Sequence, residues 1–266
     1  MTAATLVLAT IVVVLFAGVV VLGLALLRER AARKQRNLSG EWPLPRVWPE
    51  RIDARFAPGQ FGPTLETEVS FVGRGPYVVD GGTSDSEAWI LAVLARSARL
   101  MFEFGTCTGK TAYLWARNSP PDAHIVTVTL APDHLDDYRR EATDDPLDLH
   151  YALKESSHTD FLYSGTDVAA KVEQLFSDSK RLDVTAWAAR CDLVFVDGSH
   201  AYSYVVSDSD RALRLVAPGG LVLWHDYAGP HHAPGVYRAL NELSARLPLA
   251  RLEGTTLVAY RRPFER

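Results

Sequence analysis

The chain has 266 residues, of which 47% are hydrophobic and 23% are charged, and its formal net charge is −4 at pH 7. This size and apolar content predict one sizeable folded domain with a large core, together with a smaller appendage. The acidic balance excludes nucleic acid as the main partner. The two cysteines, Cys107 and Cys191, lack the spacing of a metal site or a disulfide framework, so we expect ordinary thiols in a reducing compartment.

The first 27 residues carry no charged side chain. Residues 3–27 would form a helix of roughly 37 Å at about 1.5 Å per residue, which is long enough to cross a bilayer. Positive charges follow this run in "RERAARKQR", whereas a cleaved signal peptide carries them before its apolar core. We therefore expect one transmembrane helix that stays attached and uses the lipid bilayer as a partner, rather than a helix buried in a soluble core.

The basic flank that completes residues 1–36 indicates the orientation of this membrane anchor. Five basic residues stand against one acidic residue between positions 28 and 36, so the positive-inside rule places the carboxyl-terminal domain in the cytoplasm. Removing these five of the 28 basic residues and one of the 32 acidic residues leaves a net charge of −8. We expect a single-pass membrane protein with an acidic cytoplasmic domain.

The next segment, residues 37–80, is rich in proline, glycine, tryptophan and arginine and follows neither a helical nor a strand period. Such a composition predicts an extended linker that packs back onto the folded domain through its aromatic side chains. The folded domain would then span residues 81–266.

Within that domain, apolar strand patterns alternate with amphipathic helical patterns. The expected strands are residues 100–104, 124–130, 171–177, 192–197, 220–225 and 255–260. The expected helices are residues 84–97, with Ser84, Asp85 or Ser86 as its cap, 110–118, 132–142, 207–216 and 235–247. This alternation predicts an α/β fold of the Rossmann-like, doubly wound type, with a mostly parallel sheet and helices on both faces. In such sheets, ligands bind outside the carboxyl ends of the strands.

The glycine turn after the first of these strands, in "FEFGTCTGKT", has more than one interpretation. A phosphate-binding P-loop reads G-x-x-x-x-G-K-[ST], and this turn supplies Gly109, Lys110 and Thr111 but has Phe104 where the first glycine belongs. The strand "CDLVFVD" would serve as its Walker B partner. The missing glycine counts against a nucleotide triphosphatase, because the loop must present backbone N–H groups in conformations that phenylalanine does not readily adopt.

Two other interpretations use the same turn. A dinucleotide-binding turn reads G-x-G-x-x-G and needs an acidic residue about 20 positions later, but this chain has Cys107 and Thr129 at those places. The third pattern, E-x-G-x-x-x-G, is matched by Glu103, Gly105 and Gly109. Taken alone, none of the three patterns decides the ligand.

Further motifs occur in a fixed order downstream: "LFSDS", "DLVFVDGSHAY", "LVAPGGLVLWHDY" and "PGVYRALNEL" followed by "GTTLVAY". Together with "EFGTCTG", they resemble class I S-adenosylmethionine-dependent methyltransferases, and in particular the small-molecule and sugar O-methyltransferase-like branch with D-G-x-H-x-Y and H-D-Y motifs. The resemblance covers residues 84–262 and implies a seven-stranded sheet. It favours an amino-acid tail of a sulfonium nucleoside at the glycine turn over a chain of phosphates.

The resemblance also implies a cofactor site for S-adenosyl-L-methionine. Its residues would be Glu103, Gly105, Thr106 and Gly109 at the methionine end, Asp178 and Ser179 near the adenine, and Thr129 and Asp197 between them. Thr129 departs from the family pattern, which places an acidic residue there for the ribose hydroxyls. A hydroxyl forms weaker hydrogen bonds than a carboxylate at that position.

Candidate catalytic residues fall at the ends of two later strands. Methyl transfer to oxygen requires that the acceptor hydroxyl lose its proton, and His200 and His225, with Asp226, are candidates for this work because the ordinary histidine pKa lies near neutrality. Alternatively, Asp197 and Asp226 would hold a divalent cation, with Mg²⁺ as the expected ion, that activates the hydroxyl.

The long polar connection at residues 131–170 predicts a lid or binding loop that selects the acceptor. We expect a membrane-anchored O-methyltransferase whose acceptor is a small molecule, a glycan or a lipid-linked precursor. The alternative is a catalytically weak domain that serves as a docking subunit of a membrane protein complex, because a fold alone does not establish activity.

Overall fold

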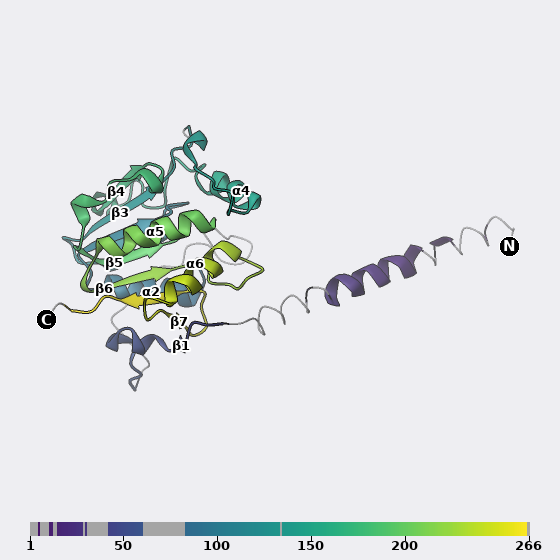
Figure 1. Ribbon diagram of the computed structural model, residues 1–266, viewed down its shortest axis with the longest axis horizontal. Helices are drawn as coiled ribbons and strands as arrows, with labels where there is room; N and C mark the ends of the chain where they lie inside the picture. The colour runs from purple at the N-terminus through teal and green to yellow at the C-terminus, as the bar shows by residue number, and fades with distance from the viewer. Residues whose placement is uncertain are drawn as a thin grey trace.

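The computed structural model describes residues 5, 11–12, 15–28, 30, 42–60, 83–133 and 135–264. Its strands are β1 Arg46–Val47, β2 Leu100–Phe104, β3 His124–Thr129, β4 Val172–Phe176, β5 Cys191–Val196, β6 Val216–Trp224, β7 Ala250–Leu252 and β8 Val258–Arg261. They form one sheet in the order β1-β7-β8-β6-β5-β2-β3-β4 (Figure 1). Strands β2 to β6 pair in parallel, and β8 runs antiparallel to β6 and β7.

The mostly parallel α/β sheet is confirmed, but the expected number of seven strands is wrong because the described residues form eight. The two strands absent from the six expected strand ranges, β1 and β7, are two and three residues long. Such short runs show no alternation of apolar and polar residues, and they are stabilised by the neighbour that they pair with. β1 lies in the segment expected to be a linker and pairs in parallel with β7.

The register of the central strands brings the functional region together. Phe104, the last residue of β2, is level with Val128 of β3 and Val196 of β5. The residues that follow these strands therefore emerge at one edge of the sheet. This is the edge where a doubly wound sheet binds its ligands.

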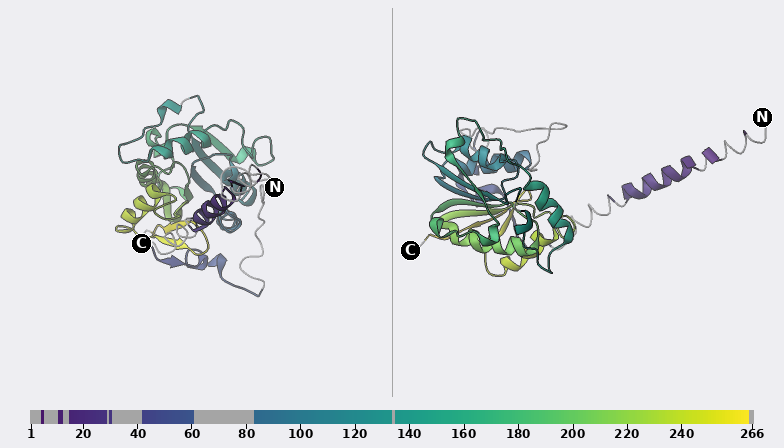
Figure 2. Two further views of the ribbon diagram at one scale, coloured as in Figure 1. Left: turned by 90° about the vertical axis from the view of Figure 1, so that its right-hand side faces the viewer. Right: turned by 90° about the horizontal axis from the view of Figure 1, so that it is seen from above.

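Helices cover both faces of the sheet, as expected. They are α2 Asp85–Ala95, α3 Lys110–Asn118, α4 Pro146–Glu155, α5 Tyr202–Leu215 and α6 Pro234–Ser244. α2 and α3 pack on one face in a core that includes Trp115 and Phe195, and α5 and α6 pack on the other face around Trp224 and Leu240. The right-hand view of Figure 2 shows the sheet between these two layers of helices.

The start of α2 follows the expected capping signal. The Ser84 hydroxyl accepts a hydrogen bond from the Glu87 amide at 3.3 Å, and the Glu87 carboxylate accepts one from the Ser84 amide at 2.8 Å. This reciprocal capping box satisfies two amides at the helix start. Ser84 is therefore the cap among the three candidates.

The helix expected at residues 132–142 does not form. The described residues there make only a 3-10 turn, Leu135–Asp137, because the segment is charged and lacks an apolar stripe to bury. A helix forms further along instead, as α4. Asp145 caps it by accepting from the Leu147 amide at 2.9 Å, and Pro146 occupies its first turn.

Residues 42–60 pack against the carboxyl-terminal part of the domain. The Trp42 ring lies edge-on to Tyr227 and Tyr237, with centroid distances of 5.4 Å and 5.8 Å, and the Arg251 guanidinium lies 3.8 Å above it. These contacts bury aromatic surface and add a cation–π interaction. Residues 61–82 lie outside the described part of the chain.

Near the amino terminus, residues 15–28 are helical and expose their apolar side chains, with Phe16 and Val19 each 70% exposed. Within the described ranges, no helix combines the length and the apolar character needed to cross a membrane. Much of the expected span of residues 3–27, and all of the basic flank except Arg28 and Arg30, lies outside those ranges.

Candidate cofactor cleft and polar cluster

A cleft lies at the carboxyl ends of β2, β3, β4 and β5, and α4 and α5 also contribute to it. Of the residues expected to bind the cofactor, Gly105, Thr129, Asp178, Ser179 and Asp197 line this cleft. Glu103, Thr106 and Gly109 are not among its lining residues. The structure therefore brings five of the eight expected residues to one cavity.

Glu103 is buried at the end of a chain of hydrogen bonds beneath the glycine turn. Tyr163 donates to the Gln174 amide oxygen at 2.6 Å, and the Gln174 amide nitrogen donates to the Thr106 hydroxyl at 3.1 Å. The Thr106 and Thr127 hydroxyls are 2.8 Å apart, and Thr127 donates to the Glu103 carboxyl at 2.6 Å. This chain ties β2, β3, β4 and the connection before β4 together.

The environment of Glu103 favours its protonated form. Burial raises the pKa of this carboxyl to about 8, and the negative charge of Asp197 adds to the shift, although hydrogen bonds from Thr127 and Thr111 oppose it. A neutral, fully buried carboxyl here holds the turn in place.

The two glycines of the turn approach other parts of the protein closely. Gly105 has a φ of +99°, and a Cβ atom added to it would lie 2.0 Å from the Asp197 carbonyl oxygen. Gly109 has a φ of +77°, and its Cβ would lie 2.7 Å from the Tyr163 ring. Both positions need glycine for backbone conformation and for packing, independently of any ligand.

The cleft is lined by four carboxylates, Glu155, Asp178, Asp197 and Asp208, and by no lysine, arginine or histidine of the described chain. Asp178 and Asp208 each have one buried carboxylate oxygen with no hydrogen-bond partner. Burial raises the pKa of Asp208 to about 7. Unpartnered carboxylate oxygens in a cleft favour a ligand that brings positive charge and hydrogen-bond donors.

Part of the long connection closes one side of the cleft, where Tyr138 packs on Tyr204. Their rings are stacked with centroids 4.5 Å apart, and the Tyr138 hydroxyl is 2.7 Å from the Ser199 hydroxyl. Both tyrosines and Ser199 line the cleft. The connection therefore brings an aromatic wall to the ligand site.

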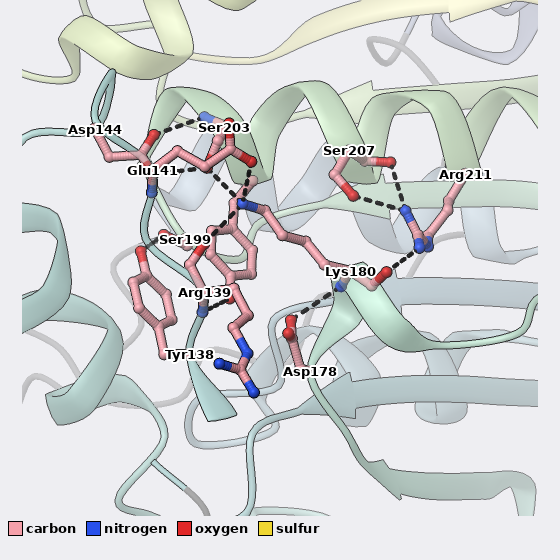
Figure 3. A network of polar contacts seen from close by, with 11 residues as sticks. Tyr138, Arg139, Glu141, Asp144, Asp178, Lys180, Ser199, Ser203, Ser207 and Arg211 are labelled. Atoms are coloured by element: carbon pink, nitrogen blue, oxygen red, sulfur yellow. Dashed lines mark hydrogen bonds and ion pairs between the residues drawn. The ribbon is translucent and has the colours of Figure 1, made fainter. Parts of the chain in front are cut away.

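This wall is fastened to the start of α5, as Figure 3 shows. The Asp144 carboxylate accepts from the Ser203 amide at 2.8 Å and from the Ser203 hydroxyl at 2.6 Å. Ala201, at the N-cap position of α5, provides no side-chain hydrogen bond, so Asp144 caps the helix from a distant part of the chain. Lys180 adds hydrogen bonds from Nζ to the Arg139 carbonyl at 2.8 Å and to the Ser203 hydroxyl at 2.6 Å.

A second group of polar side chains lies beside the cleft, at the ends of β5 and β6. His200 Nε2 is 2.8 Å from Asp226 Oδ2. His225 Nδ1 is 3.0 Å from Asp197 Oδ1 and 3.1 Å from Asp226 Oδ2. On its other side, His225 Nε2 is 3.4 Å from a Glu87 carboxylate oxygen of α2. The candidate catalytic residues thus form one cluster.

The charges in this cluster shift the pKa values of both histidines upward. Burial alone would lower the pKa of His200, but its hydrogen bond to Asp226 and the nearby carboxylates raise it to about 9. For His225, burial also acts downward, and the charge of Asp197 together with the contacts to Asp226 and Glu87 raises the pKa well above its ordinary range. Both imidazoles are therefore held in the charged form at neutral pH.

The pKa values of the two aspartates in this cluster shift in opposite directions. Burial raises the pKa of Asp197, although the charge of His225 partly offsets this. Burial also acts to raise the pKa of Asp226, but hydrogen bonds from His200 and His225 outweigh it and hold that pKa well below its ordinary range. Asp226 has a φ of +58°, a left-handed conformation that is uncommon for aspartate and that places its carboxylate between the two histidines.

A family model described as a methyltransferase domain matches residues 102–227. This part of the chain is a methyltransferase domain. The match spans the turn after β2, the cleft and the polar cluster, and it confirms the methyltransferase family expected from the sequence motifs. No curated protein matches the chain.

Solved structures to which the chain is similar include the O-methyltransferase TomG from Streptomyces achromogenes in complex with SAM, which is 22% identical over 68% of this chain and 82% of that chain, with a TM-score of 0.47. Another is an O-methyltransferase from Bacillus cereus in complex with SAH, which is 15% identical over 69% of this chain and 84% of that chain, with a TM-score of 0.47.

One group in the methyltransferase domain has the donors for a divalent cation. Ligand atoms of Asp197, His225 and Asp226 all lie within 4.8 Å of one another. Two carboxylates and an imidazole form a donor set that divalent metals accept, provided that the imidazole first loses the proton on Nδ1. The sequence motifs indicated the two aspartates as metal ligands and did not indicate His225.

The H-D-Y motif of the methyltransferase domain contributes to both the site and the core. His225 and Asp226 belong to the polar cluster, whereas Tyr227 is buried, stacks on Tyr237 with centroids 5.3 Å apart and donates a hydrogen bond to Asn241. Its hydroxyl is therefore used in packing β6 against α6.

Three acidic residues at the site were not expected from the sequence. The sequence indicates Glu87 only as part of a capping box. In the structure, its Oε1 accepts from the Thr256 amide at 2.7 Å, and its Oε2 lies 3.4 Å from His225 Nε2. Asp208 lies in the middle of α5, and Glu155 ends α4. The helical period of α5 could have indicated that Asp208 faces the cleft, whereas no sequence pattern indicated Glu155.

Proposed function

We propose that the domain transfers a methyl group from S-adenosyl-L-methionine to a hydroxyl group. The observation that supports this most is the acid-lined cleft at the carboxyl edge of a methyltransferase domain, which adjoins the His200–Asp226 pair. The cofactor carries a sulfonium and an ammonium against one carboxylate, so its net positive charge matches the cleft. When bound, it supplies the electrophilic methyl group.

The chain's own residues would hold the cofactor and the acceptor in line. Asp178, Ser179 and Thr129 offer acceptors and hydroxyls for the nucleoside, and Gly105 lets the turn pass close to the end of β5. Tyr138 and Tyr204 shield that side of the cleft from water. Holding the two reactants in one geometry is the main contribution of a binding site to such a displacement.

Removal of the acceptor proton is assigned to the His200–Asp226 pair. Asp226 contacts Nε2 of the ring at 2.8 Å and orients the imidazole. Because the pKa of His200 is raised to about 9, the ring first releases its Nδ1 proton to solvent. The freed Nδ1 then takes the hydroxyl proton as the acceptor oxygen attacks the methyl carbon and the carbon–sulfur bond breaks. His225 contacts the same Asp226 oxygen from the other side, at 3.1 Å, and holds the pair in place. Mg²⁺ on Asp197, His225 and Asp226 would instead lower the pKa of the hydroxyl by coordination.

We further propose that residues 3–27 anchor the enzyme in a membrane, with the carboxyl-terminal domain on the cytoplasmic side. The apolar side chains of the described helical residues 15–28 are exposed and pack against no core, which is consistent with a lipid environment. An anchored enzyme meets amphiphilic acceptors at high local concentration, so a lipid-linked precursor is favoured over a free small molecule or glycan. Deletion of residues 1–36 should therefore lower activity on a vesicle-borne acceptor more than on a soluble one.

Isothermal titration of the full-length protein in detergent with S-adenosylmethionine and S-adenosylhomocysteine tests the proposed function. We expect micromolar binding of both ligands and no binding of ATP or NAD. Absence of binding at millimolar ligand would refute the enzyme proposal and favour a docking subunit of a membrane complex.

A further inference from the structure

Glu155 is the last residue of α4 and lies on the inner side of this helix. Asp148 and Ala152 are buried, and the same helical spacing continues to Glu155 and Ser156. Ala152, Glu155 and Ser156 all line the cofactor cleft. Leu147 and Tyr151, on other sides of the helix, are exposed. The helix thus presents a carboxylate to the cleft.

This carboxylate lacks a partner of its own. Within the described part of the chain, the Glu155 carboxylate makes no hydrogen bond and no ion pair. Burial raises its pKa to about 7, the charges of His200 and of its chain neighbour Lys154 act downward, and the charges of Asp197 and Asp226 act upward. A half-buried carboxylate among other carboxylates is unfavourable in the free protein and becomes favourable when a cation binds beside it.

The position of Glu155 selects one end of the cleft. Apart from its chain neighbour Lys154, the charged residues that act on Glu155 follow β5 and β6, whereas Thr129 ends β3 and Asp178 follows β4. The nucleoside hydroxyls would therefore bind to residues at the ends of β3 and β4. Glu155 faces the side where the amino-acid tail and the reacting methyl group of the cofactor would lie.

We propose that the Glu155 carboxylate binds the α-ammonium group of the methyl donor's amino-acid tail. This assignment rests on the proposed function. A carboxylate only accepts hydrogen bonds, and the ammonium has three N–H donors, whereas the sulfonium has none. The pairing is charge-assisted and connects α4 to the occupied cleft. The carboxylate that binds the ammonium thus comes from the long connection, whereas the other acidic residues of the cleft come from the strand ends and α5.

Titration of full-length Glu155→Gln with three ligands tests this pairing. S-adenosylmethionine and S-adenosylhomocysteine carry the α-ammonium, and 5′-methylthioadenosine lacks the amino-acid tail. We expect the variant to bind the first two ligands on the order of 10- to 100-fold more weakly, because a hydrogen bond between charged groups is lost. Binding of 5′-methylthioadenosine should stay within about twofold of the wild type.

Glu173→Gln is the matched control, because Glu173 is half-exposed on β4 and pairs with His124 at 2.9 Å at the start of the neighbouring strand. It should bind all three ligands as the wild type does. Unchanged S-adenosylhomocysteine binding in Glu155→Gln, or an equal loss for all three ligands, would overturn the pairing. A larger loss for S-adenosylmethionine than for S-adenosylhomocysteine would place the sulfonium there instead and would also overturn it.

The same titration separates this proposal from the function on which it rests. Wild-type protein that binds none of the three ligands would refute the methyl-donor site itself and the pairing with it. Wild-type binding that is retained in Glu155→Gln would refute the pairing alone.

Discussion

Replacing Glu103 by glutamine is expected to stabilise the domain at neutral and alkaline pH. The Glu103 carboxyl is buried, accepts a hydrogen bond from Thr127 at 2.6 Å, and has a pKa raised to about 8 by burial. Glutamine has nearly the same shape, keeps an oxygen to accept from Thr127, and places its amide near the Thr111 hydroxyl. It does not ionise.

The size of the effect follows from the difference between the two pKa values. In the unfolded chain the carboxyl ionises at its ordinary value of 4.5, whereas in the folded domain it stays protonated to about pH 8. Between these values the unfolded state binds fewer protons, so the free energy of unfolding falls by about 1.4 kcal/mol for each pH unit and then levels off above pH 8. At pH 7 the accumulated loss is on the order of 3 kcal/mol, which Glu103→Gln removes.

Thermal unfolding followed by tryptophan fluorescence, in detergent from pH 5 to pH 8.5, measures this directly. If about 1 kcal/mol is lost through altered hydrogen bonding, about 2 kcal/mol remains at pH 7 and corresponds to a rise of about 4–8 °C in Tm. The difference between the variant and the wild type should be near zero at pH 5 and should grow with pH. A difference that does not depend on pH would refute a neutral, buried Glu103. The exposed substitution Glu173→Gln serves as the control.

Three further changes test separate parts of the structure. Asp144→Asn should lower the free energy of unfolding by about 1–2 kcal/mol in urea titrations, because the start of α5 loses its charged cap. Asp136→Asn, on the exposed 3-10 turn, should have little effect, and equal effects of the two substitutions would contradict the capping role. Gly105→Ala should lower the free energy of unfolding by at least about 3 kcal/mol, because the added Cβ would overlap the Asp197 carbonyl. Gly165→Ala, whose added Cβ has open space around it, should lower it by about 1 kcal/mol. His200→Asn should lower the methyl transfer rate by at least about 100-fold while S-adenosylhomocysteine binding in titration stays within twofold; an unchanged rate would move the proton acceptor to another residue.

The central strands and four of the helices were predictable from sequence because each combines a sufficient length with a clear period. β2, β5 and the exposed cap Ser84 are examples in which local pattern and tertiary packing agree. β1 and β7 are too short to carry a pattern. The helix expected at residues 132–142 does not form because this charged segment has no apolar face to pack against the domain, and helical propensity alone does not stabilise so short a helix.

The site residues that lie at the ends of strands could be predicted from the sequence. Gly105, Thr129 and Asp197 directly follow or end neighbouring parallel strands, so the topology alone brings them together. Glu103 belongs to the same motif, but side chains alternate along a strand, and Glu103 therefore points to the face opposite Phe104. A motif match does not distinguish these two faces.

Other residues of the site depend on tertiary structure that no local pattern encodes. Glu155 reaches the cleft only because α4 folds back from the long connection, and Figure 1 shows this helix at the end of the sheet, outside the two main helical layers. Glu87 approaches His225 only because α2 packs beside β6 and the segment around Thr256. Both carboxylates come from elements distant in sequence from the histidines.

A crystal structure of the full-length protein with S-adenosylhomocysteine tests the central claim most directly. We predict the nucleoside between Asp178 and Thr129 and the amino-acid tail beside Glu155 and Asp197, in the cleft at the carboxyl ends of β2 to β5. A ligand bound elsewhere, or a cleft that stays filled by Tyr138 and α4 at saturating ligand, would contradict this account.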